Sequence, residues 1–424
     1  MIEDFKFNKN NWYKKNKCVL CDSNKLDIIL NFGKTPLANS FLKKKIKQKL
    51  FKLQVAICKN CKHVQLKHIV NPDIIFKNYL YVSGTSKILL DHFDKYSEKI
   101  INKFNLKKKD SILDIACNDG TFLNCFKKKG FSNLVGVDPA KNLKIYNKKK
   151  KIIIENFFFN HENSYALQKK YGKFRIITAN NVCAHTPYLN NFFKGVYNLL
   201  DLSGVFVFEV SYLLDVIKKK TFDTIYHEHM SYHSLLPLIN FVKNNGLEVF
   251  DFDLVEAQGG SIRIYVGHKK KQIVKINKII KQIKKEKLAG IYQNNTYATY
   301  YNEILKNKIK LRNTINFFKK NNYTIVGYGA PAKLTTFSYI FNLTNKDIDF
   351  VIDDNPLKQE RFTPGTNIKI INFKKSLQIM KMKKIVIFIL AWNFYSSIKK
   401  RCQDDLGKEI SFVKPFPEII IDNI

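Results

Sequence analysis

The spacing of apolar residues divides the chain into helical and extended segments. Between positions 84 and 104 apolar residues recur at helical spacing, which predicts an amphipathic helix. They are Ile88, Leu89, Phe93, Tyr96, Ile100 and Phe104. Residues 270–320 are lysine-rich and keep the same period, so we expect a linking pair of helices whose charge forms a solvated face.

Two stretches follow the order strand, turn of small residues, helix, strand. In the first, "SILDIACNDGTFLNCFKKKG" (111–130) leads to the strand "LVGVDPA" (134–140). In the second, the strand 323–329 and the turn "GAPAK" precede a helix to about 341. Further strands are expected at 174–182, 204–210, 261–268, 348–356 and 384–392, and a helix at 190–200. Repeated units of this kind predict an α/β fold with two Rossmann-like domains.

Length and composition are those of a globular protein of two or three domains, because 424 residues exceed one ordinary core and 45% are hydrophobic. The N-terminal "MIEDFKFNKNNWYKKNK" is polar throughout and does not read as a signal peptide. The longest apolar run, 385–392, is far shorter than a membrane span. We therefore expect a soluble cytoplasmic protein with no membrane partner.

The net charge of +38 would ordinarily suggest a nucleic-acid or membrane partner. Here the excess is almost entirely lysine, accompanied by abundant Asn, Ile, Phe and Tyr, the residues whose codons are richest in A and T. The lysines are also scattered in short runs. We interpret the charge as the mutational bias of an AT-rich genome and expect no nucleic-acid partner, although an anionic substrate would be attracted.

Four of the eight cysteines form two close pairs, Cys18 with Cys21 and Cys58 with Cys61. Two C-x-x-C knuckles can complete a tetrahedral four-sulfur zinc site, and such a site leaves no open position for chemistry. "LANSFL" and "KLQVAIC", between the pairs, look like short strands. We expect a small β-rich module stapled by structural zinc, in preference to two redox pairs. The other cysteines read as buried thiols in a reducing compartment.

The first strand–turn–helix unit has the features of a nucleotide site. Asp138 ends its second strand, 18 residues after Gly120, where an acid can hold a ribose by its hydroxyls. The phosphate fingerprint G-x-G-x-x-G is absent, and "ACNDG" in its place puts polar and negative character beside the ligand. S-adenosylmethionine is therefore favoured over NAD or FAD. The candidate cofactor-binding residues are Tyr81, Asp114, Asn118, Asp119, Gly120, Asp138, Asn180 and Asn181.

Ligands of open α/β sheets bind beyond the carboxyl ends of the strands. "NNVCAH" (180–185) and the segment after 204–210, which contains "IYHEHMSYH" (225–233), should lie on that side. In the second α/β unit the turn before Lys333 can form an anion cradle at a helix N-terminus. Lys358 and Arg361 are further candidates for holding a phosphate.

In their joint order these segments resemble a known family, the three-domain S-adenosylmethionine-dependent C-methyltransferases that act at C-3 of nucleotide-linked 4-keto-deoxysugars. The likeness covers nearly the whole chain. The segments that carry it are "CVLC", "CKNC", "YLYVSGTS", "LDIACNDGTFL", "GVDPA", "NNVCAH", "YHEH", "GGSIRIYV", "YGAPAK" and "DDNPLKQERFTPGT". The resemblance implies a class I methyltransferase domain between the zinc module and a C-terminal domain that helps to hold the sugar nucleotide, expected to be a dTDP-sugar.

By the same resemblance, His229 is the expected base, assisted by Tyr226, Glu228 and His185, with Tyr81 as a weaker candidate. A histidine suits this role because its unperturbed pKa lies near neutrality, and removal of a proton α to a ketone gives an enolate that can attack a sulfonium methyl. The zincin pattern H-E-x-x-H is not met, so a catalytic metal is disfavoured.

The expected domains are a zinc module (1–75), a methyltransferase domain (76–268), a helical linker (269–320) and a Rossmann-like substrate domain (321–424). A monomer or weak homodimer is expected. Two rival functions remain: a zinc-ribbon RNA-binding protein or RNA methyltransferase, supported by charge alone, and a dinucleotide-dependent oxidoreductase, suggested by two Rossmann-like units.

Overall fold

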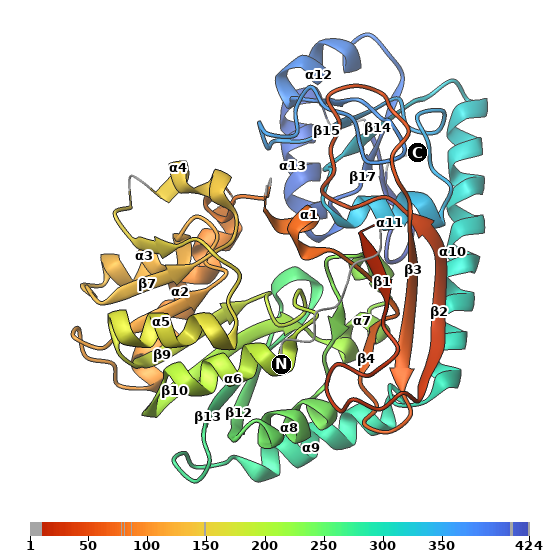
Figure 1. Cartoon of the computed structure of the whole chain (residues 1–424). Helices are drawn as coiled ribbons and strands as arrows, with labels where there is room; N and C mark the ends of the chain where they lie inside the picture. The colour runs from red at the N-terminus through yellow and green to blue at the C-terminus, as the bar shows by residue number, and fades with distance from the viewer. Residues whose placement is uncertain are drawn as a thin grey trace. The chain divides into compact units, whose positions relative to one another are not determined.

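A computed structural model describes residues 11–77, 79, 81–85, 87–147, 150–407 and 410–422. The chain forms two compact units (Figure 1). Unit 1 comprises Met1–Asp27, Ala56–Leu214 and Met230–Tyr292, and unit 2 comprises Ile28–Val55, Asp215–His229 and Gln293–Ile424. Each unit contains one large α/β sheet. Among the described residues, no helix combines the length and apolar character that a membrane crossing requires.

The sheet of unit 1 has seven strands in the order β12-β13-β10-β9-β6-β7-β8. Their bounds are β6 Ile112–Ile115, β7 Leu134–Val137, β8 Ile153–Glu155, β9 Phe174–Asn180, β10 Leu200–Ser211, β12 Leu247–Val255 and β13 Ser261–His268. All pairings are parallel except those of β13, which is antiparallel to both neighbours. The predicted strands at 174–182, 204–210 and 261–268 are confirmed, whereas β8 and β12 escaped sequence analysis.

Helices of unit 1 pack against this sheet and against one another. The helices of unit 1 are α1 Pro72–Phe76, α2 Lys87–Lys103, α3 Thr121–Lys128, α4 Lys144–Asn147, α5 His161–Tyr171, α6 Leu189–Leu199, α8 Leu235–Asn244 and α9 Ile276–Leu288. Helices α5 and α6 lie side by side against the sheet (Figure 1). Helix α2 confirms the helix predicted over 84–104, and its Tyr96 stacks on Phe122 of α3 with ring centroids 4.7 Å apart.

The N-terminal region is β-rich, as expected. Strand β1 (Trp12–Lys14) pairs with β5 (His68–Val70), and a second sheet has the order β11-β4-β3-β2. Its strands are β2 Leu26–Thr35, β3 Phe51–Cys58, β4 Val64–Leu66 and β11 Ser231–Tyr232. β3 confirms the predicted strand "KLQVAIC". The strand predicted for "LANSFL" is wrong: only Leu42 forms an isolated bridge there, because Pro36 ends the preceding ladder after β2.

The sheet of unit 2 has six strands in the order β16-β15-β14-β17-β18-β19. The strands are β14 Thr324–Tyr328, β15 Phe350–Ile352, β16 Ile370–Ile371, β17 Ile385–Ile389, β18 Ser411–Lys414 and β19 Ile420–Asp422. Only β19 is antiparallel. In chain order this is 3-2-1-4-5-6, the Rossmann arrangement, and the chain reverses direction across the sheet between β14 and β17. β15 is shorter than predicted because Asp353 already begins a turn.

The helices of unit 2 are α10 Asn294–Lys320, α11 Lys333–Ile340, α12 Phe373–Met380 and α13 Tyr395–Leu406. Helix α7 (Leu213–Lys218) leads from unit 1 into the segment 215–229, which belongs to unit 2. The 3₁₀ turn η3 (Phe222–Thr224) anchors this segment, because Phe222 packs against Phe337, Phe341 and Phe416. The histidine-rich stretch therefore divides between the two units after His229.

Candidate active site

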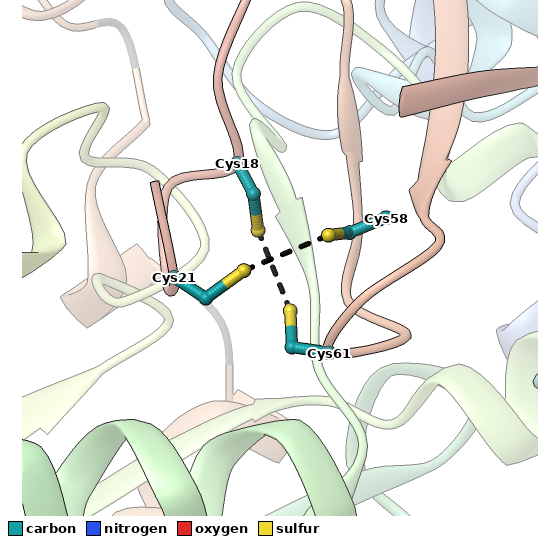
Figure 2. Close-up of side chains that lie close together, drawn as sticks. All are labelled: Cys18, Cys21, Cys58 and Cys61. Carbon is teal, nitrogen blue, oxygen red and sulfur yellow. Dashed lines mark hydrogen bonds between the residues drawn. The ribbon is translucent and has the colours of Figure 1, made fainter. Parts of the chain in front are cut away.

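The four paired cysteines converge within unit 1 (Figure 2). Their sulfur atoms all lie within 4.8 Å of one another, with Cys18 Sγ 3.5 Å from Cys61 Sγ and Cys21 Sγ 3.6 Å from Cys58 Sγ. These distances exclude disulfides, whose sulfurs lie about 2.05 Å apart. Four sulfurs each about 2.3 Å from one zinc ion would be separated by about 3.8 Å, so the arrangement fits structural zinc.

The turn after β6 has the strained backbone of a ligand-binding loop. Ala116, Asn118 and Gly120 adopt φ angles of 54°, 56° and 73°, a region that costs residues other than glycine about 1–2 kcal/mol each. The Asn118 amide donates to Asp138 Oδ2 at 2.8 Å, and the Ala140 amide donates to Asp138 Oδ1 at 2.8 Å. Burial, opposed by these amides, raises the pKa of Asp138 to about 6. The turn and the acid thus form one rigid group.

Asp114 and Asn180 lie on neighbouring strands of the same sheet. Thr178 Oγ1 donates to Asp114 Oδ1 at 2.7 Å, and burial raises the pKa of Asp114 to about 7. Both polar atoms of the Asn180 side chain are buried without a hydrogen-bond partner among the described residues. Such orphaned atoms are rare unless a ligand or water satisfies them. Asn180 at the carboxyl end of β9 therefore fits a residue that contacts a bound nucleoside.

Three of the predicted cofactor residues have hydrogen-bond partners inside the protein. Asp119 Oδ2 accepts from Lys150 Nζ at 2.6 Å, so a lysine balances the negative charge that the sequence placed beside the ligand. The Asn118 side chain donates to the Tyr81 carbonyl at 3.0 Å, which ties the "YLYVSGTS" loop to the turn. The Asn181 amide donates to the Glu209 carbonyl at 2.7 Å. All of the predicted cofactor residues belong to unit 1.

The predicted catalytic residues are divided between the units. His185 belongs to unit 1, where its ring stacks on Phe76 with centroids 5.7 Å apart. Tyr226, Glu228 and His229 belong to unit 2. The Glu228 side chain accepts from Asn39 Nδ2 at 2.6 Å, which fixes its carboxylate.

His229 has the protonation state of a base. Its Nδ1 lies 2.6 Å from the Thr224 carbonyl oxygen, and because a carbonyl can only accept, Nδ1 carries the proton. Nε2 is then an acceptor, and the Tyr226 hydroxyl donates to it at 3.0 Å. Burial, together with the positive charge of Lys333, lowers the pKa of His229 to about 4. The imidazole is therefore neutral at pH 7, with its Nε2 lone pair held by a hydroxyl.

The three predicted substrate-binding cations all lie in unit 2. Lys333 begins α11, and its ammonium lies 5.0 Å from the ring centroid of Trp392. Lys358 donates to the Ala330 carbonyl at 2.8 Å, in the turn before α11. Arg361 lies 3.5 Å from the Phe41 carbonyl oxygen. The "GAPAK" turn thus contains Lys333 and accepts a hydrogen bond from Lys358.

Several buried polar residues of the two units were not predicted from the sequence. Asp223 Oδ2 accepts from Trp392 Nε1 at 2.6 Å in unit 2. In unit 1, Arg263 Nε and Nη2 donate to Glu209 Oε2 at 3.0 and 2.6 Å, and His92 Nε2 lies 3.1 Å from Glu209 Oε1. An acid within the apolar run "GVFVFEV" was a signal for this buried ion pair. Asp223 offered only its position three residues before Tyr226.

Three family models match successive parts of the chain. They are described as "Putative zinc binding domain" (residues 18–76), "Methyltransferase domain" (89–251) and "C-methyltransferase C-terminal domain" (256–417). The C-methyltransferase NovU of Streptomyces niveus is 28% identical over 405 residues, which cover 95% of this chain and 96% of that protein.

Solved methyltransferases also match part of the chain. A S-adenosylmethionine-dependent methyltransferase from Clostridium acetobutylicum is 17% identical and covers 42% of this chain and 92% of its own, with a TM-score of 0.33. Magnesium protoporphyrin IX methyltransferase from Synechocystis, with bound S-adenosylhomocysteine, is 13% identical and covers 42% and 83%, with a TM-score of 0.33.

The seven-stranded α/β sheet and the match to a methyltransferase domain over residues 89–251 identify a S-adenosylmethionine-dependent methyltransferase. More narrowly, the chain belongs to the C-methyltransferase family that combines an N-terminal zinc-binding domain, a central methyltransferase domain and a C-terminal α/β domain. The methyl group is therefore transferred to carbon.

Proposed function

We propose that the acceptor is C-3 of a nucleotide-linked 4-keto-deoxysugar, with dTDP as the nucleotide. The observation that carries the proposal is the state of His229, a buried, neutral imidazole with its lone pair on Nε2. Carbon is methylated by an electrophilic donor only once it carries negative charge, and a proton next to a ketone is acidic enough for such a base. The 4-keto group thus makes C-3 reactive.

His229 Nε2 takes the proton from C-3, and Thr224 holds the opposite ring nitrogen so that the imidazolium that forms keeps its orientation. Tyr226 occupies Nε2 in the resting state and yields this position to the substrate C–H. Glu228, fixed by Asn39, contacts a hydroxyl of the sugar. His185 is a further proposed assistant of the base. S-adenosylmethionine supplies the methyl group as a sulfonium electrophile.

Donor binding is proposed for the residues around the β6 turn. Asp138 accepts hydrogen bonds from the ribose hydroxyls, and Asn180 contacts the adenosyl group with its orphaned amide. Asp114, Asn118, Asp119, Gly120 and Asn181 shape the loop, and Tyr81 covers it. Lys333, Lys358 and Arg361 hold the acidic sugar nucleotide.

We also propose the linear division into domains at 1–75, 76–268, 269–320 and 321–424, and a cytoplasmic location, where nucleotide sugars and the methyl donor are made.

The direct test is incubation of the purified protein with S-adenosylmethionine and a panel of 4-keto-6-deoxy nucleotide sugars, followed by mass spectrometry. We expect one sugar to gain the mass of a single methyl group in place of hydrogen. Absence of any gain across the panel, under conditions in which the protein binds the donor, would contradict the proposed acceptor.

A further inference from the structure

A cluster of polar side chains lies at the topological switch point of the unit 2 sheet, between β14 and β17. β14 and β17 are adjacent parallel strands with Tyr328 opposite Ile389 at their carboxyl ends. Beyond these ends the chain supplies Lys333, at the start of α11, and Trp392, at the start of the 3₁₀ turn Trp392–Phe394. Crevices at switch points are the usual ligand sites of open α/β sheets.

Asp223 joins this cluster from the segment 215–229. Its side chain is 2% exposed, and Oδ2 accepts from the Trp392 indole at 2.6 Å. Oδ1 is buried and has no hydrogen-bond partner within the described part of the chain. Burial raises the pKa of Asp223, and the positive charge of Lys333 opposes this. An unsatisfied buried carboxylate oxygen is costly, so a nearby cation is needed to keep it ionised.

Lys333 is that cation. It is half-buried, and its ammonium lies over the Trp392 ring, 5.0 Å from the centroid. Burial lowers the pKa of Lys333, and the negative charge of Asp223 raises it. The positive charge of Lys333 also lowers the pKa of His229. Thr224, the residue after Asp223, holds His229 in place, because its carbonyl oxygen accepts from Nδ1 at 2.6 Å. Asp223 thus acts on Lys333, and Lys333 acts on the imidazole, whose Nε2 accepts from the Tyr226 hydroxyl.

We propose that Lys333 is a catalytic residue that stabilises the enolate oxygen, and that Asp223 and Trp392 are its positioning residues. This inference rests on the proposed function. When Nε2 of His229 takes the C-3 proton, the C–H electron pair becomes the C-3/C-4 double bond and the carbonyl π pair moves onto oxygen. That oxygen pairs with the Lys333 ammonium. When C-3 bonds to the methyl carbon, the methyl–sulfur bond of the donor breaks, its electron pair goes to sulfur, and S-adenosylhomocysteine leaves. The carbonyl re-forms and the imidazolium releases its proton to water.

A lysine is better suited to this task than the tyrosine of the same unit. The Tyr226 hydroxyl is uncharged and has only one proton to give. An ammonium has three donors and a full charge, and in a dry site a fixed cation facing developing negative charge is among the largest contributions to catalysis. The negative charge of Asp223 opposes the fall in pKa that burial causes in Lys333.

The test separates enolisation from methyl transfer. A 4-keto nucleotide sugar that the wild type methylates is placed in D₂O with the full-length protein and no methyl donor, and loss of its C-3 proton signal is followed by NMR. We expect Lys333→Met to slow this exchange about 100-fold or more, the usual consequence of losing one oxyanion-stabilising donor. Lys333→Arg should retain part of the rate because it keeps the charge.

The matched control is Lys374→Met, an exposed lysine in the first turn of α12 of the same unit, which should exchange at the wild-type rate. Asp223→Asn tests the positioning role by a different readout. With its counter-charge removed, Lys333 loses its proton at lower pH, so the basic limb of the exchange–pH profile should move down by about one pH unit or more.

The outcomes are distinct. If the wild type methylates a sugar but Lys333→Met exchanges its proton at the wild-type rate, the inference is wrong and the proposed function stands. A wild type that methylates no sugar in the panel overturns both. Should Lys333→Met fail to fold, as judged by its melting temperature, Lys333→Arg and Asp223→Asn decide: an Asp223→Asn pH profile that superimposes on the wild type would refute the role of the pair.

Discussion

The two large sheets of this chain place an aspartate at the same point and surround it differently. Asp138 follows the second strand of the unit 1 sheet and accepts from the Asn118 and Ala140 amides at 2.8 Å each. Asp353 follows the second strand of the unit 2 sheet and accepts from the Ala330 and Asn355 amides at 2.7 and 2.9 Å. In both, the acid fastens the turn that follows the first strand.

The two turns differ in the charge beside the aspartate and in the space next to the turn. Beside Asp138, burial and the negative charge of Asp119 raise the pKa of the acid to about 6. Beside Asp353, Lys358 Nζ lies 3.7 Å from the carboxylate and 2.8 Å from the Ala330 carbonyl. Gly329 has a φ of 91°, and a Cβ there would lie 2.4 Å from Ala391 Cβ.

The same strand–turn–helix arrangement can therefore form a turn that is open to a ligand or a turn that is packed against the protein's own side chains. In the proposed site of unit 1, Asp138 accepts hydrogen bonds from hydroxyl groups of the ligand. In unit 2 Lys358 and Ala391 lie against the equivalent turn, and the proposed catalytic groups lie at the neighbouring switch point with Lys333 and Trp392. A dinucleotide site is thus disfavoured in unit 2, because its turn is packed against Ala391, which follows β17.

The first variant removes the proposed base in unit 2 and leaves the Asp138 turn of unit 1 unchanged. We expect His229→Ala to lower kcat by about 10²–10⁴, the usual contribution of a general base, because the variant has no imidazole to accept the C-3 proton. Donor affinity, measured by isothermal titration calorimetry, should not change. His227→Ala is the control, since the His227 ring packs at 5.8 Å against Phe51. Equal losses in both variants would contradict the assignment.

The next prediction compares the two aspartates directly. Asp138→Ala should weaken binding of S-adenosylmethionine about 10- to 100-fold, the equivalent of one hydrogen bond to a charged group. Asp353→Ala, which removes the equivalent acid, should leave donor affinity unchanged. Calorimetric titration of both variants measures the difference. Weaker donor binding in Asp353→Ala would show that the two turns are not specialised as described.

The closed turn of unit 2 can be tested through stability. Lys358→Met leaves Asp353 without its cation and frees the Ala330 carbonyl, so we expect the free energy of unfolding to fall by about 1–3 kcal/mol. Urea denaturation at pH 7 measures this change. Lys374→Met, on the exposed face of α12, serves as the control and should change little. A stability equal to the wild type would mean that the lysine does not close the turn.

The last prediction concerns the pH dependence of the free energy of unfolding. The pKa of His229 is about 4 in the fold and about 6.5 when unfolded, so the unfolded chain binds the proton more readily. Stability should therefore be intact above pH 6.5 and decline as the pH falls toward 4. Between pH 6.5 and 5 this group accounts for roughly 2 kcal/mol. His229→Gln should lose correspondingly less over that interval, as measured by urea denaturation.

Much of the fold was accessible from sequence because periodicity reports local structure. The helix over 84–104, the strands of both sheets other than β8, β12, β16, β18 and β19, and the converging cysteine pairs follow from spacing alone. The family resemblance selected His229. What sequence order could not predict is that segment 215–229, directly after a strand of unit 1, packs into unit 2 through Phe222. That choice depends on contacts with Phe337, Phe341 and Phe416, residues more than a hundred positions away.

The same reason explains the site residues that were missed. Asp223 and Trp392 are 169 positions apart and become partners only after both segments reach the switch point. Neither belongs to a recognisable motif. Conversely, Asp119 was predicted to present charge to the ligand, but Lys150, from a lysine run interpreted as mutational bias, neutralises it. Pairing across long separations is set by tertiary packing, which local patterns do not encode.

The most direct measurement of the central claim uses a 4-keto-deoxy nucleotide sugar carrying deuterium at C-3, together with S-adenosylmethionine. The account predicts a methylated product from which the deuterium has been lost, because the base must remove it before carbon can accept the methyl group. A methylated product that retains the deuterium would place the methyl elsewhere and contradict the account.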